Sequence, residues 1–136
     1  MSASARLPSS PQTFLSFDFS PKRVGVASGN AITRTATPLT TITQDGDARF
    51  AAIGKLIAEW RPGALVVGVP RHPDGAPHDN TRRAERFARQ LAGRFGLPVH
   101  EVDERYTTTE ARAFGACDVD AAAAALILEQ FLREPS

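Results

Sequence analysis

The chain has 136 residues, 42% of them hydrophobic and 23% charged, and its formal net charge is +1. This length suits one ordinary domain, and the composition is typical of a globular protein rather than a disordered or fibrous one. No run approaches the ~20 apolar residues of a membrane-spanning helix, and the single cysteine, Cys117, excludes an internal disulfide. We therefore expect one cytoplasmic domain over residues 13–136, with no membrane contact, after a disordered tail over residues 1–12.

The near-zero net charge hides two halves of opposite sign. From Arg71 to Arg94 there are six arginines and three acids, whereas from Glu101 to Glu134 there are eight acids and three arginines. An enzyme that holds a phosphate backbone and cuts it with metal-bound carboxylates needs both kinds of surface. Ordinary solvated helix faces explain the charge pattern equally well, so the pattern alone does not decide.

The first expected elements are two apolar strands at residues 13–18 and 24–28, joined by a tight turn from Phe19 to Arg23. Asp18 ends the first of these strands. A carboxylate in an apolar strand needs a partner or a metal ion. A third, short strand is expected at residues 35–39.

A helix follows, with Asp45 or Asp47 as its cap and Arg61-Pro62-Gly63 as its end. The helix places four apolar residues on one stripe, namely Phe50, Ile53, Ile57 and Trp60. We therefore expect Trp60 to lie in the core.

The second half alternates strands and helices. A continuous apolar strand at 64–69 precedes a proline-rich loop, and a helix with arginines on its outer side covers 81–95. Another strand is expected at 99–103. Thr107 and Glu110 form a capping box that begins a short helix, and the alanine-rich segment 121–133 forms the last helix, with its alanines serving close packing.

The expected fold is α/β. Its elements follow in the order three strands, helix, strand, helix, strand and two helices. Three antiparallel strands followed by parallel strands give a mixed five-stranded sheet. Right-handed crossovers then place helices on both faces of that sheet.

Carboxylates recur at the ends of these elements. Alternation along the strand at 99–103 puts Glu104 and Asp103 on opposite faces, so only one of them can readily share a cleft with Asp18. Asp118 and Asp120 precede the last helix, where Asp120 alone is explained as an N-cap. Acids from one strand, a later strand end and the start of a helix can together hold one or two divalent ions.

Four segments resemble the YqgF/RuvX family, which comprises proposed pre-16S ribosomal RNA nucleases with an RNase H-like fold related to the RuvC Holliday-junction resolvases. They are LSFDFSPKRVGV at 15–26, VVGVP at 66–70, VDERYTTTEAR at 102–112 and VDAAAAALILE at 119–129. All four stand in the family's order, and the resemblance covers residues 13–133.

The resemblance implies a role for each matching residue. Asp18, Glu104 and Asp120 would be catalytic and would bind Mg²⁺ or Mn²⁺, with Asp103 and Asp118 as alternate ligands. Basic residues would contact substrate phosphates, namely Lys22, Arg23 and Arg105, with Arg82, Arg83, Arg86 and Arg89 as candidates that a solvated helix face also explains.

The implied function is metal-dependent hydrolysis of phosphodiester bonds, in processing the 5′ end of pre-16S ribosomal RNA and also on branched or single-stranded DNA. The implied partners are nucleic acid and pre-ribosomal particles, and the chain would act as a monomer or homodimer.

Two departures from the family pattern favour an alternative, a non-catalytic RNA-binding or ribosome-assembly module that retains the fold. Ser20-Pro21 replaces the family's usual Gly-Thr, and residues 114–118 leave a shorter loop before the last helix.

Overall fold

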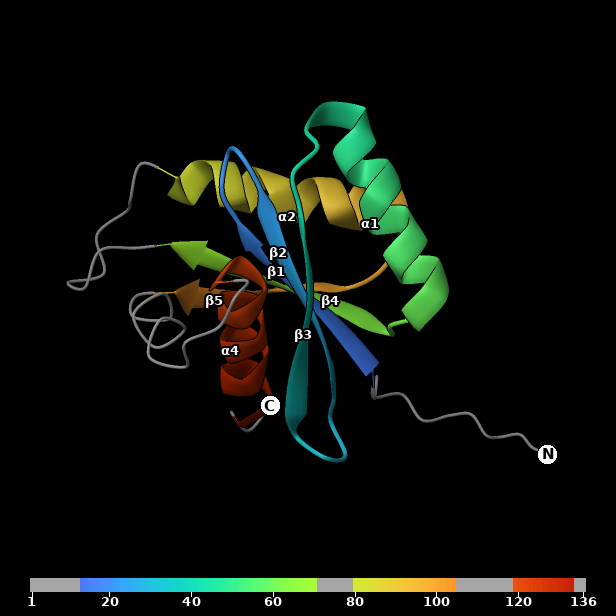
Figure 1. Cartoon of the computed structure of the whole chain (residues 1–136), viewed down its shortest axis with the longest axis vertical. Helices are drawn as coiled ribbons and strands as arrows, with labels where there is room; N and C mark the ends of the chain where they lie inside the picture. The colour runs from blue at the N-terminus through green and yellow to red at the C-terminus, as the bar shows by residue number, and fades with distance from the viewer. Residues whose placement is uncertain (1–12, 71–79, 105–118, 134–136) are drawn as a thin grey trace.

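The computed structural model describes residues 13–70, 80–104 and 119–133, with only the backbone of Glu104 and Val119. The elements, numbered as in Figure 1, are β1 (Thr13–Phe19), β2 (Val24–Asn30), β3 (Thr35–Ile42), α1 (Gly46–Trp60), β4 (Ala64–Pro70), α2 (Thr81–Phe95), β5 (Val99–Glu104) and α4 (Val119–Arg133). The short helix expected from Thr107 lies outside the described residues.

All five strands belong to one sheet, in the order β3-β2-β1-β4-β5. β1 pairs antiparallel with β2 and β2 with β3, whereas β1 to β4 and β4 to β5 are parallel. The predicted mixed five-stranded sheet is therefore confirmed. Because β1, β4 and β5 run in the same direction, their carboxyl ends share one edge of the sheet.

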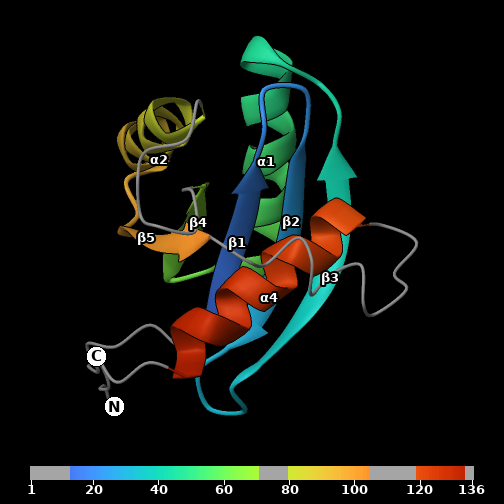
Figure 2. The ribbon, with the colours of Figure 1, turned by 90° about the vertical axis from the view of Figure 1, so that its left-hand side faces the viewer.

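Helices cover both faces of this sheet, as the sequence predicts (Figures 1 and 2). Between the sheet and α1 and α2 lies the larger apolar cluster, which includes Phe17, Val26, Ile53, Val67, Phe87 and Leu91. Against α4 lies a second cluster of buried residues, namely Phe14, Ala64, Val66, Val102, Ile127 and Leu128. None of the helices in the described ranges is long and apolar enough to cross a membrane.

α4 packs closely against β2. A Cβ atom on Gly25 would overlap the main-chain carbonyl of Asp120, and one on Gly29 would lie 2.5 Å from a methyl carbon of Leu128 in α4. Between these glycines, Ala27 packs against the alanine run of α4. Small residues on both partners thus let the helix backbone reach the strand, in agreement with the close packing expected for the alanine run.

A buried hydrogen bond fixes α4 along the neighbouring strand β1. The Ser16 hydroxyl, which is fully buried, donates to the Ala124 carbonyl oxygen at 2.7 Å. Such a bond contributes about 1 kcal/mol to stability. It also shows that the even-numbered residues of β1 face α4, because neighbouring residues of a strand point to opposite faces.

The expected core position of Trp60 is wrong. Its side chain is 38% exposed, because Trp60 is the last residue of α1 and the exposed Arg61 follows it. The other members of the stripe lie in or against the larger apolar cluster.

Of the two predicted helix caps, the position of Asp45 is confirmed and that of Asp120 is not. Asp45 occupies the N-cap position of α1, but its side chain makes no capping hydrogen bond. α4 begins at Val119, so Asp120 is the second helical residue rather than the N-cap. There its charge still interacts favourably with the helix dipole.

Replacing Gly25 by alanine tests the close approach of α4. The added methyl group overlaps the helix backbone, so we expect Gly25→Ala to lower the free energy of unfolding by about 1–3 kcal/mol. Gly93 in α2 is the matched control, because a Cβ there meets nothing within 4 Å. Gly93→Ala should raise stability by roughly 0.5–1 kcal/mol. Equal stability of the two variants in urea titrations would contradict the packing described.

Candidate functional site

Asp18 lies near the carboxyl end of β1, between two glycines. Its register partners are Gly25 in β2 and Gly68 in β4. Like Ser16, two residues earlier, Asp18 faces α4. Opposed residues of an antiparallel pair have Cβ positions about 4.5–5.5 Å apart, and the Cβ direction of Gly25 is filled by the Asp120 carbonyl. The strand carboxylate is therefore next to the first turn of α4, with no side chain on either neighbouring strand beside it.

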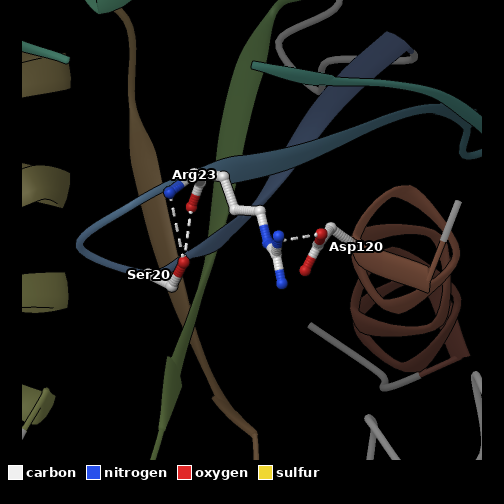
Figure 3. A network of polar contacts seen from close by, with 3 residues as sticks. All are labelled: Ser20, Arg23 and Asp120. Carbon is white, nitrogen blue, oxygen red and sulfur yellow. Dashed lines mark hydrogen bonds and ion pairs between the residues drawn. The ribbon is translucent and has the colours of Figure 1, made fainter. Parts of the chain in front are cut away.

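Asp120 forms an ion pair with the turn between β1 and β2. Arg23 Nε lies 2.9 Å from Asp120 Oδ2, and the two side chains are 58% and 29% exposed, respectively (Figure 3). Water therefore reaches both groups. The pair links the acidic residue of the first α4 turn to the last residue of the β1–β2 turn.

The turn that carries Arg23 is closed from within by Ser20. Ser20 N donates to the Arg23 carbonyl at 2.9 Å, and the Ser20 hydroxyl donates to the same carbonyl at 2.8 Å. Arg23 N in turn donates to Ser20 Oγ at 3.3 Å. A glycine at this position would lack the last two bonds, so Ser20 stabilises the turn by contacts that the family's usual residue cannot make.

A buried arginine holds the same turn from the α1 side. Arg49 is only 6% exposed; its Nε donates to the Gln44 carbonyl at 3.0 Å and an Nη donates to the Pro21 carbonyl at 3.1 Å. Its guanidinium lies 5.7 Å from the centre of the Phe19 ring. Burial lowers the pKa of Arg49 from its usual value, and nearby Asp45 opposes that shift. Arginine nonetheless stays protonated in proteins.

Sequence reasoning missed Arg49. An arginine in the first turn of a helix is typical of a solvated surface. One signal was available, since Arg49 precedes Ile53 by four residues and so lies on the apolar side of the helix.

On β5, the backbone separates the acids as expected. His100 packs its ring 5.0 Å from that of Phe131 in α4, and Val102 is buried in the same layer. Glu101 and Asp103 are exposed and belong to the other face. By the same alternation position 104 belongs to the α4 face, where its register partner is Pro70 at the end of β4.

The remaining predicted residues divide into two groups. Lys22 is exposed on the β1–β2 turn, and four arginines are exposed along α2, namely Arg82, Arg83, Arg86 and Arg89. Arg105 and Asp118 lie outside the described residues, as does the shortened loop before Asp118.

The predicted metal ligands are brought together only in part. Among the side chains that the structure describes, no three His, Cys, Asp or Glu lie close enough to hold a metal ion. That set does not include the side chain of Glu104. Asp18 and Asp120 supply the carboxylate oxygens that Mg²⁺ and Mn²⁺ prefer, and the register partners of Asp18 on both neighbouring strands are glycines, which carry no competing side chain. The described residues are thus chemically suited to such an ion.

Comparison with known sequences gives a consistent set of relatives. A model of the RuvX family, described as "Holliday junction resolvase", matches residues 12–134. A Polaromonas protein named "Putative pre-16S rRNA nuclease" is 67% identical over 122 residues, which is 90% of this chain and 88% of the relative. A protein of the same name from Burkholderia pseudomallei is 56% identical over 127 residues, covering 88% and 87% of the two chains.

Comparison with solved structures identifies the fold. The chain is similar to RuvC of T. thermophilus in complex with Holliday junction substrate, with a TM-score of 0.57 and 14% identity over 88% of this chain and 93% of RuvC. A second T. thermophilus RuvC structure gives a TM-score of 0.52 over the same shares. RuvC has an RNase H-like fold, so the fold expected from the sequence is confirmed.

The exposure of the Arg23–Asp120 pair predicts a small energetic coupling. In a double-mutant cycle with Arg23→Met and Asp120→Asn, we expect a coupling of about 0.2–1 kcal/mol in the free energy of unfolding at low salt. It should fall in about 1 M salt, where the screening length is about 3 Å. A coupling above roughly 2 kcal/mol that salt does not reduce would contradict this and would show that the Arg23–Asp120 pair contributes strongly to the stability of the fold.

Proposed function

Since the chain belongs to the RuvX family of Holliday junction resolvases, we propose that it hydrolyses phosphodiester bonds in nucleic acid with divalent metal ions. In this proposal the hydrolysis takes place in the cytoplasm and processes the 5′ end of pre-16S ribosomal RNA. Branched or single-stranded DNA is a further substrate. The names of its relatives support the RNA substrate.

The placement of Asp18 is the observation that carries this proposal. Asp18 has a glycine as its register partner on both neighbouring strands, and the main chain of Asp120 lies against the first of these glycines, Gly25. Asp18 and the turn of α4 that carries Asp120 are therefore brought next to each other by the packing of α4 against β2. This arrangement also occurs at the carboxyl edge of the parallel strands, where open α/β sheets bind ligands.

Three carboxylates would hold the metal ions, namely Asp18, Asp120 and Glu104, with Asp103 and Asp118 as alternates. Bound there, such ions lower the pKa of an attacking water and stabilise the leaving oxygen. Glu104 is the proposed third ligand because position 104 shares the sheet face of Val102, which packs against α4.

Basic residues of the β1–β2 turn would position the substrate. Arg23 holds the Asp120 carboxylate at 2.9 Å and is more than half exposed, so its remaining N–H groups can donate to a phosphate oxygen beside the acids. Lys22 adds an exposed positive charge on the same turn. Arg105, which follows Glu104, is assigned the same role from the family pattern.

The alternative is a non-catalytic RNA-binding module, and the contacts of Ser20 weigh against one argument for it. Ser20-Pro21 departs from the family pattern, yet Ser20 closes the turn and Pro21 accepts a hydrogen bond from Arg49. The turn still presents Arg23 to Asp120. The Ser20-Pro21 departure therefore does not disrupt the turn beside Asp18 and Asp120.

Substitution of the three acids tests the metal-dependent nuclease. Asp18→Asn, Glu104→Gln and Asp120→Asn should each lower the rate of cleavage of labelled RNA and DNA oligonucleotides, with Mg²⁺ or Mn²⁺, by roughly a hundredfold or more. Glu101→Gln is the matched control, because Glu101 is exposed on the other face of β5. Its cleavage rate should stay near that of the native chain.

Three results separate the readings. Full cleavage by Asp18→Asn would refute catalysis at these acids. Oligonucleotide binding without cleavage by the native chain, at any concentration of either metal, would establish the non-catalytic module. Equal loss of activity in Glu101→Gln and Glu104→Gln would contradict the assignment of faces on β5. Thermal melting of every variant checks that it is folded.

A further inference from the structure

A groove of about 300 Å³ lies between α1 and α2, on the sheet face opposite the acids. Its lining includes Phe19, Arg49, Phe50, Arg83, Arg86 and Gln90. Phe19 is the last residue of β1, Arg49 lies in the first turn of α1, and the two α2 arginines lie in the first half of their helix. The groove therefore opens at the same end of β1 as Asp18. Figure 2 shows this end, where the β1–β2 turn lies next to the start of α1.

The groove is positively charged. Three arginines line it, and no carboxylate does so among the described residues. Arg83 and Arg86 are exposed, and the described partner of Arg83 is the neutral Asn80 side chain, at 3.5 Å. Asp47, which stands between the groove residues Gly46 and Arg49 in the first turn of α1, pairs with Arg94 at 3.5 Å, so its charge is already balanced by a different cation. Two arginine side chains are thus presented to solvent in a concave site.

Arg49 and the aromatic rings make the floor of the groove. Arg49 uses its donors on main-chain carbonyls of Gln44 and Pro21, so it contributes charge rather than a direct ligand contact. The Phe19 ring is half-buried and lies 5.0 Å from the ring of Phe87, and Phe50 lies 5.9 Å from Phe87. Aromatic side chains beside exposed arginines are the combination with which proteins hold single-stranded nucleic acid.

The position of the groove relative to the acids gives it a role. Asp18 and Phe19 are consecutive in one strand, so they point to opposite faces of the sheet. A nucleic-acid strand with one phosphate at Asp18 need only pass over the Ser20–Arg23 turn to reach Phe19 and the two arginines. The exposed Lys22 and Arg23 lie on that path.

We propose that this α1–α2 groove binds the sugar-phosphate backbone of the substrate strand, adjacent to the phosphate that is cut. Arg83 and Arg86 contact successive phosphates, and Phe19 provides the ring against which the intervening nucleotide packs. The proposal rests on the proposed function for its ligand, a nucleic acid, but not on catalysis. It distinguishes these two arginines from Arg82 and Arg89, which belong to the same helix but do not line the groove.

That distinction supplies a matched experiment. The double variants Arg83→Gln/Arg86→Gln and Arg82→Gln/Arg89→Gln each remove two positive charges from exposed positions of α2. Binding of a fluorescein-labelled single-stranded RNA is measured by anisotropy in EDTA, over a range of salt concentrations, so that cleavage plays no part. The first variant should bind about tenfold more weakly, and the slope of log K against log salt should fall by about 1.4, the value for two lost phosphate contacts. For the second variant we expect less than a threefold change and an unchanged slope.

Any other result would refute the proposal that the groove binds nucleic acid. Equal weakening in both variants would show a diffuse electrostatic effect of α2. Unchanged binding in the first variant, or no binding by the native chain, would also refute it. Cleavage rates of the same variants keep the two proposals apart, because failure of the groove leaves the Asp18→Asn result unaffected, and failure of catalysis leaves the binding result unaffected.

Discussion

The contact between the backbone of α4 and that of β2 determines the geometry of the whole candidate site. Glycine at position 25 allows the Asp120 carbonyl to reach the strand, and a side chain there would push the helix away. Because Gly25 is also the register partner of Asp18, the absence of a side chain at position 25 brings the main chain of Asp120 next to the strand position of Asp18. On the β4 side, the register partner of Asp18 is likewise a glycine, Gly68. Packing and chemistry are therefore joined at one main-chain contact, and the stability of this layer and the form of the site are set together.

A second set of contacts fixes the turn between β1 and β2, and with it Arg23. Ser20 closes this turn, while Arg49 ties it to the start of α1 through the Pro21 carbonyl. Removing a buried guanidinium that satisfies main-chain carbonyls would leave those acceptors without partners, which costs about 1–3 kcal/mol for each buried group. Three elements thus converge on the turn: a strand end, a helix start and, through Asp120, the first turn of α4. The β1–β2 turn therefore lies between the Arg23–Asp120 pair on one face of the sheet and Arg49 on the other.

Much of this could be predicted from the sequence because it rests on local patterns. The mixed five-stranded sheet, its antiparallel and parallel strands and the opposite faces of positions 103 and 104 follow from the period of two in strands and from right-handed crossovers. What could not be predicted depends on contacts between distant residues. The burial of Arg49 is set by carbonyls of two separate loops, and the exposure of Trp60 by where α1 ends relative to the sheet. Likewise, the ion pair between Asp120 and Arg23 could not be predicted, because it joins residues almost a hundred positions apart in the sequence.

The alanine run of α4 takes on a different meaning beside these contacts. The Ser16 hydroxyl bonds to the Ala124 carbonyl, and the Asp120 carbonyl lies against Gly25, so the helix is fixed to the sheet at two points one turn apart. Adding or removing one residue between them would advance the helix by about 1.5 Å and rotate it by about 100°, which would carry Asp120 away from β2. The side chains of this segment have no chemistry of their own, yet the number of residues in it acts as a spacer. The segment can therefore vary in composition, within the limit of small size, but not in length.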